Sequence, residues 1–233
     1  MKLTSLCISS AKLTSPVRIA LAADLHSADP APALEKLYGI KPDVTVVAGD
    51  LFDSPGDDPQ NALAFLRGAA SVSRVIYTMG NHECGGGKWI EDLDIPSTGA
   101  VCLENDSLRV GEIVFGGYRD ASGGDAFALD FARQPGFKAL ICHRPERYGR
   151  YLRGLDIDLI LSGHAHGGQI GFFGRGLYAP GQGLFPKYVR GIYDGRLVVS
   201  RGLTNSVPVP RLFNPTELIC LDLIPKNARK SDL

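Results

Sequence analysis

The stretch "VRIALAADLHSADPAPALEKLYGIKPDVTVVAGD" (residues 17–50) decides the fold. Its first part, 17–24, is an almost continuous apolar run that ends at Asp24, and its last part, 43–50, is a second such run that ends at Asp50. Short apolar runs of this kind are typical of strands buried on both faces of a parallel sheet. The segment 33–40 between them has the spacing of a short helix. The pattern therefore predicts a βαβ unit.

The same alternation continues along the chain. A helix over 58–72 precedes a strand over 74–81, and the strands over 138–143 and 158–164 flank a basic helix over 146–155. We also expect a hairpin over 107–117, a helix over 126–134, a hairpin over 188–200 around Asp194-Gly195, and a last strand over 216–223. The sequence thus predicts an α/β protein whose C-terminal third is rich in strands.

The bulk composition excludes several classes of protein. At 233 residues and 44% hydrophobic content, we expect one domain over residues 1–233. Basic and acidic residues balance at 25 each, so no net charge attracts the chain to nucleic acid or to an anionic membrane. The five scattered cysteines indicate neither a disulfide framework nor a zinc ribbon. Without a signal-peptide pattern or an apolar run of transmembrane length, we expect a cytoplasmic protein with no transmembrane anchor.

Polar residues gather at the ends of the predicted strands, where ligands bind in open α/β sheets. These residues are Asp24, His26, Asp50, Asn81, His82, His143, His164 and His166, and they include all five histidines of the chain. Carboxylate, amide and imidazole groups without thiolates suit manganese, iron or zinc. One ion needs fewer ligands than this set offers, so the economical interpretation is a pair of transition-metal ions.

Each of these residues also has an ordinary interpretation. An aspartate such as Asp24 or Asp50 commonly occupies a turn or a helix N-cap, and His143 alone would be a hydrogen-bonded core histidine. His26 alone would be a surface loop residue. All of these interpretations would have to hold at once, and we therefore prefer the metal site.

Five short motifs carry a resemblance to a known family. They are "DLH" (24–26), "GDLFD" (49–53), "GNHE" (80–83), "CHRP" (142–145) and "GHAHGG" (163–168). In this order and spacing they resemble the motifs of the calcineurin-like metallophosphoesterase superfamily, and the C-terminal third resembles its bacterial single-domain phosphodiesterase branch. The resemblance implies a four-layer αββα sandwich, with two mixed sheets flanked by helices and a dinuclear metal centre at the strand ends.

The resemblance also implies a role for each motif residue. The first metal would be held by Asp24, His26 and His166, and the second by Asn81, His143 and His164, with Asp50 bridging the two. His82 would protonate the leaving oxygen, and Asp53 would orient His82. Glu83 would be a hydrogen-bonding group outside the ligand set. We expect 164–166 to be extended, so that alternate residues present their imidazoles to different ions.

The implied activity is hydrolysis of a phosphodiester or diphosphate bond by a hydroxide that bridges two metal ions. The implied partner is a small phosphate ester, including a nucleotide sugar or a lipid-linked diphosphate. A phosphomonoesterase, a nuclease and a catalytically silent scaffold remain alternatives. A phosphoprotein phosphatase is disfavoured because Ser54-Pro55 stands where that branch has Arg-Gly. The loop 167–186 follows the last two histidines and would form a wall of the site, its aromatic residues either lining a groove or packing.

Overall fold

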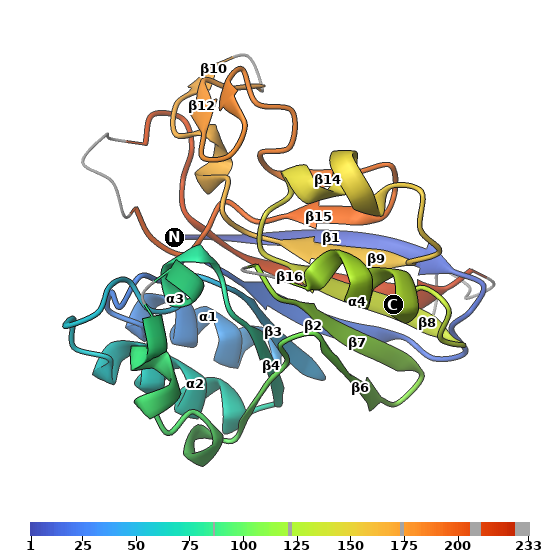
Figure 1. Ribbon diagram of the computed structural model, residues 1–233, viewed down its shortest axis with the longest axis horizontal. Coiled ribbons are helices and arrows are strands. Elements are labelled where there is room, and N and C mark those ends of the chain that lie inside the picture. The colour runs from blue at the N-terminus through green and yellow to red at the C-terminus, as the bar shows by residue number, and fades with distance from the viewer. Residues whose placement is uncertain (86, 121–122, 173–174, 206–210, 227–233) are drawn as a thin grey trace.

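The computed structural model describes residues 1–85, 87–120, 123–172, 175–205 and 211–226, and two six-stranded sheets form its centre (Figure 1). The first sheet contains, in spatial order, β1 (Lys2–Ser10), β16 (Glu217–Pro225), β2 (Val17–Ala22), β3 (Val44–Ala48), β4 (Arg74–Thr78) and β5 (Ala100–Cys102). The second contains β14 (Gly191–Tyr193), β15 (Leu197–Val199), β9 (Leu159–Ser162), β8 (Phe137–Cys142), β7 (Ile113–Tyr118) and β6 (Asp106–Val110).

Both sheets combine parallel and antiparallel pairs. In the first sheet, β2, β3, β4 and β5 are parallel, whereas β16 is antiparallel to β2 and parallel to β1. In the second, β7, β8, β9 and β15 are parallel, and the edge strands β6 and β14 are antiparallel to their neighbours. The parallel strands therefore end together, at one edge of each sheet.

The helices cover the outer faces of the two sheets. The α-helices are α1 (Ala31–Ile40), α2 (Gln60–Ala70), α3 (Asn81–Gly85) and α4 (Gly124–Phe131). Short 3₁₀ turns are η1 (Gly87–Asp92), η2 (Pro96–Thr98) and η4 (His166–Gly168), and η3 (Tyr148–Leu152) is a π-turn. Two small hairpins, β10 (Gly171–Phe172) with β11 (Arg175–Gly176) and β12 (Tyr178–Ala179) with β13 (Gly183–Leu184), project from the sandwich in Figure 1.

Apolar side chains form three layers between these elements. Along β2, Ile19 and Leu21 pack between the two sheets, whereas Ala20 packs beneath α1 and α2. This alternation follows from the two-residue period of a strand, with both faces buried. On the far side, Ile160 of β9 packs beneath α4 with Phe131. The order helix, sheet, sheet, helix confirms the predicted αββα class.

Three local predictions need correction. The predicted strands over 17–24, 43–50 and 74–81 end two or three residues early, because the polar residues at their ends lie in turns. The predicted helix over 146–155 is only the single turn η3. The strand β1 was missed, although its alternate residues are half-buried as the period of a strand requires. No helix in the described ranges is long and apolar enough to cross a membrane.

Candidate metal centre

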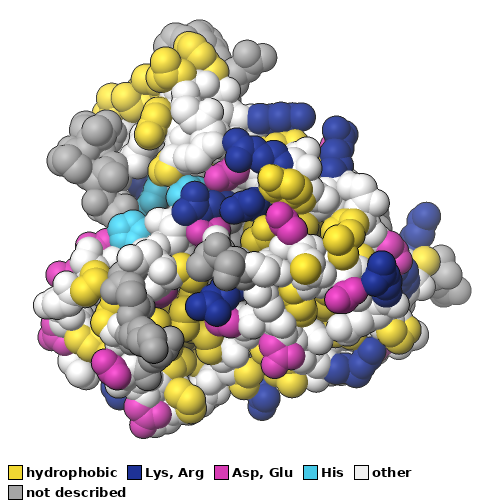
Figure 2. All heavy atoms as spheres, in the orientation of Figure 1, with side chains coloured by type: hydrophobic (Ala, Val, Ile, Leu, Met, Phe, Trp, Pro, Cys, Tyr) yellow, Lys and Arg dark blue, Asp and Glu magenta, His cyan; other side chains and the backbone are white. Residues whose placement is uncertain are grey.

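The predicted ligands follow parallel strands of both sheets: most lie in turns, whereas Asn81 is the first residue of α3 and His166 the first residue of η4. Direct hydrogen bonds join these turns: Asp24 N donates to Gly49 O at 3.0 Å, and Gly163 N donates to His143 O at 3.0 Å. The two sheets meet where His164 N donates to the Asp24 carboxylate, 3.0 Å from Oδ1. Histidine side chains are visible together on the surface in Figure 2, below the projecting hairpins. One edge of the sandwich therefore collects polar groups from distant parts of the chain.

Three overlapping sets of side chains offer ligand atoms within 4.8 Å of one another. The first set is Asp24, His26 and His166; the second is Asp50, His143 and His164; the third is His26, Asp50 and His82. Because His26 and Asp50 each belong to two sets, the sets form one continuous cluster. Asn81 follows Gly80, where an added Cβ would collide with Oδ1 of Asp50, so glycine is required for this close approach.

The backbone at the cluster adopts an unusual conformation. Five of the predicted ligands have positive φ: Asp24 (55°), His26 (49°), Asp50 (50°), His164 (64°) and His166 (45°). A left-handed conformation costs a residue with a side chain roughly 1–2 kcal/mol. Such strain is retained where the surrounding structure holds it, typically at functional sites. The expectation of an extended segment at 164–166 was wrong, because two left-handed residues turn the chain there and η4 follows.

Several of the predicted ligands have buried side-chain atoms without a hydrogen-bond partner. Among the described residues these atoms include His26 Nε2, His164 Nε2 and Asn81 Oδ1, while His143 Nε2 meets Asp50 Oδ2 at 3.0 Å. Burying a polar atom without a partner costs about 1–3 kcal/mol, so such atoms are expected to have a ligand. The other ring nitrogen is held in two cases, since His143 Nδ1 donates to Ala48 O at 2.7 Å and His26 Nδ1 lies 3.0 Å from Asp53 Oδ1. These donors fit metal ions, because the groups that hold Nδ1 turn Nε2 toward the cluster, and a cation there would replace the proton between His143 Nε2 and Asp50 Oδ2.

Glu83 holds the turn that carries Asp50. Its fully buried carboxylate accepts four backbone N–H groups: Asp50 at 3.0 Å, Leu51 at 2.6 Å, Phe52 at 3.0 Å and Gly80 at 2.7 Å. One side chain thus joins the turns after β3 and β4. The sequence analysis expected Glu83 to be a hydrogen-bonding group outside the ligand set. In the structure its carboxylate holds the turns after β3 and β4 together.

Charge is unevenly distributed over the cluster. Burial opposes ionisation of both Asp50 and His143, but their mutual attraction is stronger, so the pKa of Asp50 falls well below its usual range and that of His143 rises to about 10. Burial raises the pKa of Asp24 to about 7 and lowers the pKa of His164 to about 2 and of His166 to about 3. The protein groups alone thus keep one tight ion pair, with His143 Nε2 3.0 Å from Asp50 Oδ2, and neutral imidazoles around it.

His82 lies at the edge of the cluster rather than inside it. Its side chain is 35% exposed, and its Nε2 is 4.0 Å from Asp50 Oδ2. Its Nδ1 is 2.7 Å from the backbone oxygen of Asp53 and 3.2 Å from Asp53 Oδ1. Two acceptors therefore hold a proton on Nδ1, and Nε2 faces the cluster. The same Asp53 carboxylate also reaches His26, a contact that the sequence did not indicate.

Arg211 and Asn214 were missed by the sequence analysis. Arg211 Nη2 lies 3.0 Å from His166 Nδ1, and Asn214 Nδ2 donates to His166 O at 2.7 Å. A guanidinium only donates, so His166 Nδ1 accepts and a neutral ring carries its proton on Nε2. A cation bound through Nε2 would displace that proton, as metal binding to histidine generally does.

The loop 167–186 forms the small hairpins β10–β11 and β12–β13 beside His166. Tyr178 and Phe185 are 49% and 74% exposed, so neither packs in a core, whereas Tyr188 is buried. The side chain of Phe172 and the whole of Phe173 lie outside the described residues. Tyr188, which follows this loop, is thus a packing residue, whereas Tyr178 and Phe185 are surface residues.

Comparison with known proteins identifies relatives of this chain. The family model described as calcineurin-like phosphoesterase matches residues 17–168. The chain is 33% identical over 225 residues to an uncharacterized metallophosphoesterase, Cj0846, of Campylobacter jejuni, covering 91% of this chain and 59% of that protein. An uncharacterized metallophosphoesterase of Helicobacter pylori (strain 26695) is 27% identical over 237 residues, covering 93% of this chain and 62% of that protein.

Two further comparisons cover less of this chain. A Bos taurus protein described as a transmembrane protein with metallophosphoesterase domain is 31% identical over 157 residues, which cover 56% of this chain and 34% of that protein. The crystal structure of TT1561 from Thermus thermophilus aligns with a TM-score of 0.44 and 10% identity, covering 63% of this chain and 81% of that one. The chain spans about three fifths of the bacterial relatives it matches (59% and 62%).

Proposed function

The chain belongs to the calcineurin-like phosphoesterase family, and we propose that it hydrolyses phosphodiester or diphosphate bonds at a centre of two metal ions. The observation that supports two ions is the overlap of the ligand sets. Asp24, His26 and His166 form one set, Asp50, His143 and His164 form another, and His26 and Asp50 link them through the third. A single ion would leave several buried donors without a partner.

We assign the residues as the family resemblance implies. Asp24, His26 and His166 hold the first ion, Asn81, His143 and His164 hold the second, and Asp50 contributes to both. Manganese, iron and zinc all fit a set of carboxylate, amide and imidazole donors. When bound, such ions supply the positive charge that makes a water molecule acidic enough to attack phosphorus near neutral pH. Because both sheets contribute ligands, we also propose that residues 1–233 act as one phosphoesterase domain.

His82 is the residue that we propose as the general acid. Its Nδ1 proton is held by Asp53, so a second proton on Nε2 is the one that faces the cluster and that a leaving oxygen would receive. Its partial exposure leaves room for a substrate beside it. A correctly placed general acid contributes about 10²–10⁴ in rate.

The charge of the turn after β3 supports a diester or diphosphate over a monoester. Asp50 is assigned to the proposed ions, but Asp53 is a further carboxylate beside His82, with Oδ1 3.2 Å from Nδ1, and residues 50–58 include no basic residue. A phosphomonoester dianion has one more negative charge to place near Asp53 than a diester anion has. Repulsion between like charges therefore favours the diester.

The test compares two nitrophenyl substrates in the same buffer and with the same metal. We expect a higher kcat/KM for bis-nitrophenyl phosphate than for nitrophenyl phosphate, with no hydrolysis of either after chelation. A monoester preference that persists across manganese, iron and zinc would overturn the proposed substrate class. One observation favours that second candidate, a phosphomonoesterase: the Arg211 guanidinium lies 3.0 Å from His166 and is a cation at the cluster.

A further inference from the structure

An apolar crest stands beside the metal cluster. It consists of six exposed side chains: Leu177, Tyr178, Leu184, Phe185, Leu212 and Phe213. The most exposed are Phe213 at 89%, Phe185 at 74% and Leu184 at 69%. Figure 2 shows yellow side chains over the projection that carries β10 and β12, above the histidines.

Hydrogen bonds hold the crest together as one surface. Leu212 pairs with Ile170 in a parallel bridge, and Leu177 N donates to Ile170 O at 3.1 Å. Phe185 N in turn donates to Leu177 O at 2.9 Å, and Tyr178 pairs with Leu184 across the hairpin β12–β13. Ile170, the segment 175–185 and Leu212 therefore lie side by side, although 27 positions of chain separate Phe185 from Leu212.

Such a concentration of exposed apolar side chains requires an explanation. Single exposed apolar residues are normal, and Tyr38 (43%) and Leu129 (51%) are examples elsewhere in this chain. A contiguous apolar surface usually contacts a partner or a membrane.

The charge of the segments around the crest indicates what kind of partner it contacts. The two segments that build it, 167–190 and 201–216, contain five basic residues and no acidic residue in the sequence. The whole chain is neutral, so the rest of it carries the compensating negative charge. Arg201 pairs with Glu217 and Arg211 is turned to His166, so a basic group that these segments place beside the crest is Lys187, which lines a hollow with Arg150, Arg153 and Phe185. An apolar surface next to such basic groups matches an anionic, amphipathic partner.

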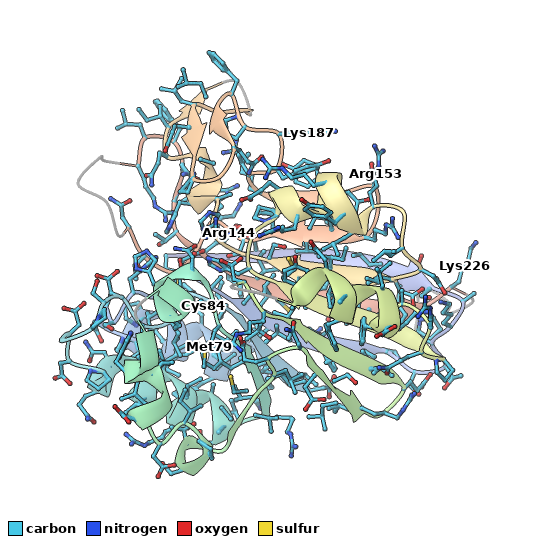
Figure 3. All side chains as sticks on the ribbon, viewed as in Figure 1. Met79, Cys84, Arg144, Arg153, Lys187 and Lys226 are labelled. Atoms are coloured by element: carbon cyan, nitrogen blue, oxygen red, sulfur yellow. The ribbon has the colours of Figure 1, made fainter. Side chains whose placement is uncertain are left out.

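A basic hollow adjoins the crest. It has a volume of about 440 Å³, and its lining includes Phe185 together with Arg150, Arg153 and Lys187. Figure 3 labels Arg153 and Lys187, whose side chains extend outward on the same side of the molecule. Arg153 is also paired with Asp194, at 3.0 Å. The hollow contains one buried carboxyl group, Glu146, and burial raises the pKa of that group, which favours its neutral form.

We propose that the crest docks on a lipid bilayer that contains anionic lipids. The apolar side chains enter the boundary between headgroups and acyl chains, and Arg150, Arg153 and Lys187 meet the headgroup phosphates. Because Leu177 N donates to Gly168 O at 3.0 Å, the crest adjoins η4, which carries His166, and docking holds the metal cluster close to the membrane surface. This surface acts independently of the proposed hydrolysis, so either proposal can fail alone.

Vesicle co-sedimentation of the full chain tests the proposal. We expect binding to vesicles of phosphatidylcholine with phosphatidylglycerol, weaker binding to phosphatidylcholine alone, and loss of binding as salt is raised. The double variant Leu184→Ser/Phe185→Ser should lose at least tenfold in partitioning. Arg150→Ala and Lys187→Ala should each lose about fivefold. The matched control is Leu129→Ser, which removes a comparably exposed apolar residue on α4 and should bind as the unchanged chain does.

Two outcomes would overturn the proposal. One is vesicle binding that is absent, or that survives the double variant undiminished while thermal unfolding shows that the variant is folded. The other is a sedimentation-velocity result in which the unchanged chain self-associates and the double variant is monomeric, with no binding to vesicles. In that case the crest would be an interface between copies of the chain.

Discussion

Replacing Glu83 with glutamine isolates the contribution of one buried carboxylate to the metal cluster. Oε1 of Glu83 accepts the N–H groups of Leu51 and Phe52, and Oε2 accepts those of Asp50 and Gly80. Glutamine has a single side-chain oxygen. Two of these four N–H groups would therefore face the NH2 group of the glutamine side chain, which only donates hydrogen bonds.

The size of the effect follows from those two lost hydrogen bonds. A hydrogen bond to a charged group contributes about 1.5–3 kcal/mol, so losing two costs about 3–6 kcal/mol. Burial, followed by the charge of Asp50, raises the pKa of Glu83, which shows that the charged form is itself unfavourable there. Removing that charge offsets part of the loss, and we expect the free energy of unfolding to fall by about 3 kcal/mol.

Glu104→Gln is the matched control for this experiment. Glu104 is also largely buried, and burial raises its pKa to about 7, but its Oε1 accepts only one backbone N–H, from Met79 at 2.8 Å. The glutamine oxygen can keep that hydrogen bond, so the change in stability should be below about 1 kcal/mol. Urea unfolding in the presence of a chelator measures both variants, and metal titration shows whether Glu83→Gln also weakens binding. Equal stability and equal metal affinity of the two variants would refute the reasoning.

Three further predictions concern the cluster itself. Asp50→Asn removes a charge from both proposed sites, so elemental analysis of the purified variant should find less of both ions; a full metal content would contradict the bridging role. His82→Ala should keep its metal and lose about 10²–10⁴ in turnover, less for a nitrophenolate leaving group, and loss of metal would make His82 a ligand. The pKa values of His164 and His166 are lowered to about 2 and about 3, so the unfolded chain binds more protons than the folded chain below pH about 6.5. Their contribution to the stability of the chelated protein should therefore fall as the pH falls from 6.5 toward 3, whereas Asp24 and Glu104, whose pKa values are raised to about 7, and Glu83, whose pKa is also raised, contribute in the opposite direction. His164→Ala should therefore lose less stability toward low pH than the unchanged chain does, and denaturant midpoints that run parallel for the two over this range would contradict these shifts.

The sequence predicted the location of the site better than its internal contacts. Apolar runs ending in Asp24, Asp50 and His143 mark the ends of parallel strands, and the geometry of a parallel sheet brings such ends to one edge. The pairing of the two sheets was not visible in these runs and came from the resemblance to a family. The left-handed turns at His164 and His166 could not be predicted, because no local residue preference favours positive φ for histidine strongly enough to be read from one sequence.

Contacts between the site and distant segments of the chain could not be predicted from any local sequence pattern. Arg211 reaches His166 across 45 positions, and nothing in its own neighbourhood marks it as different from any other basic residue. Part of the crest could be expected from the sequence, because the aromatic residues after His166 stand out there. The contribution of Leu212 and Phe213 could not, because it depends on the bridge between Leu212 and Ile170. The balanced total charge also concealed the cationic segments around the crest.

Asp53 shows why the spacing of motifs identifies the residues of a site but not the role of each residue. The family resemblance assigns its carboxylate to His82, yet Oδ1 is 3.0 Å from His26 Nδ1 and 3.2 Å from His82 Nδ1. A carboxylate that accepts from a histidine ligand raises the basicity of that ligand, and one beside an acid histidine stabilises its protonated form. A single negative charge therefore serves both a metal ligand and the proposed proton donor. Asp53 thus contacts a proposed metal ligand and the proposed general acid at once, so we expect a substitution of Asp53 to affect both metal binding and turnover.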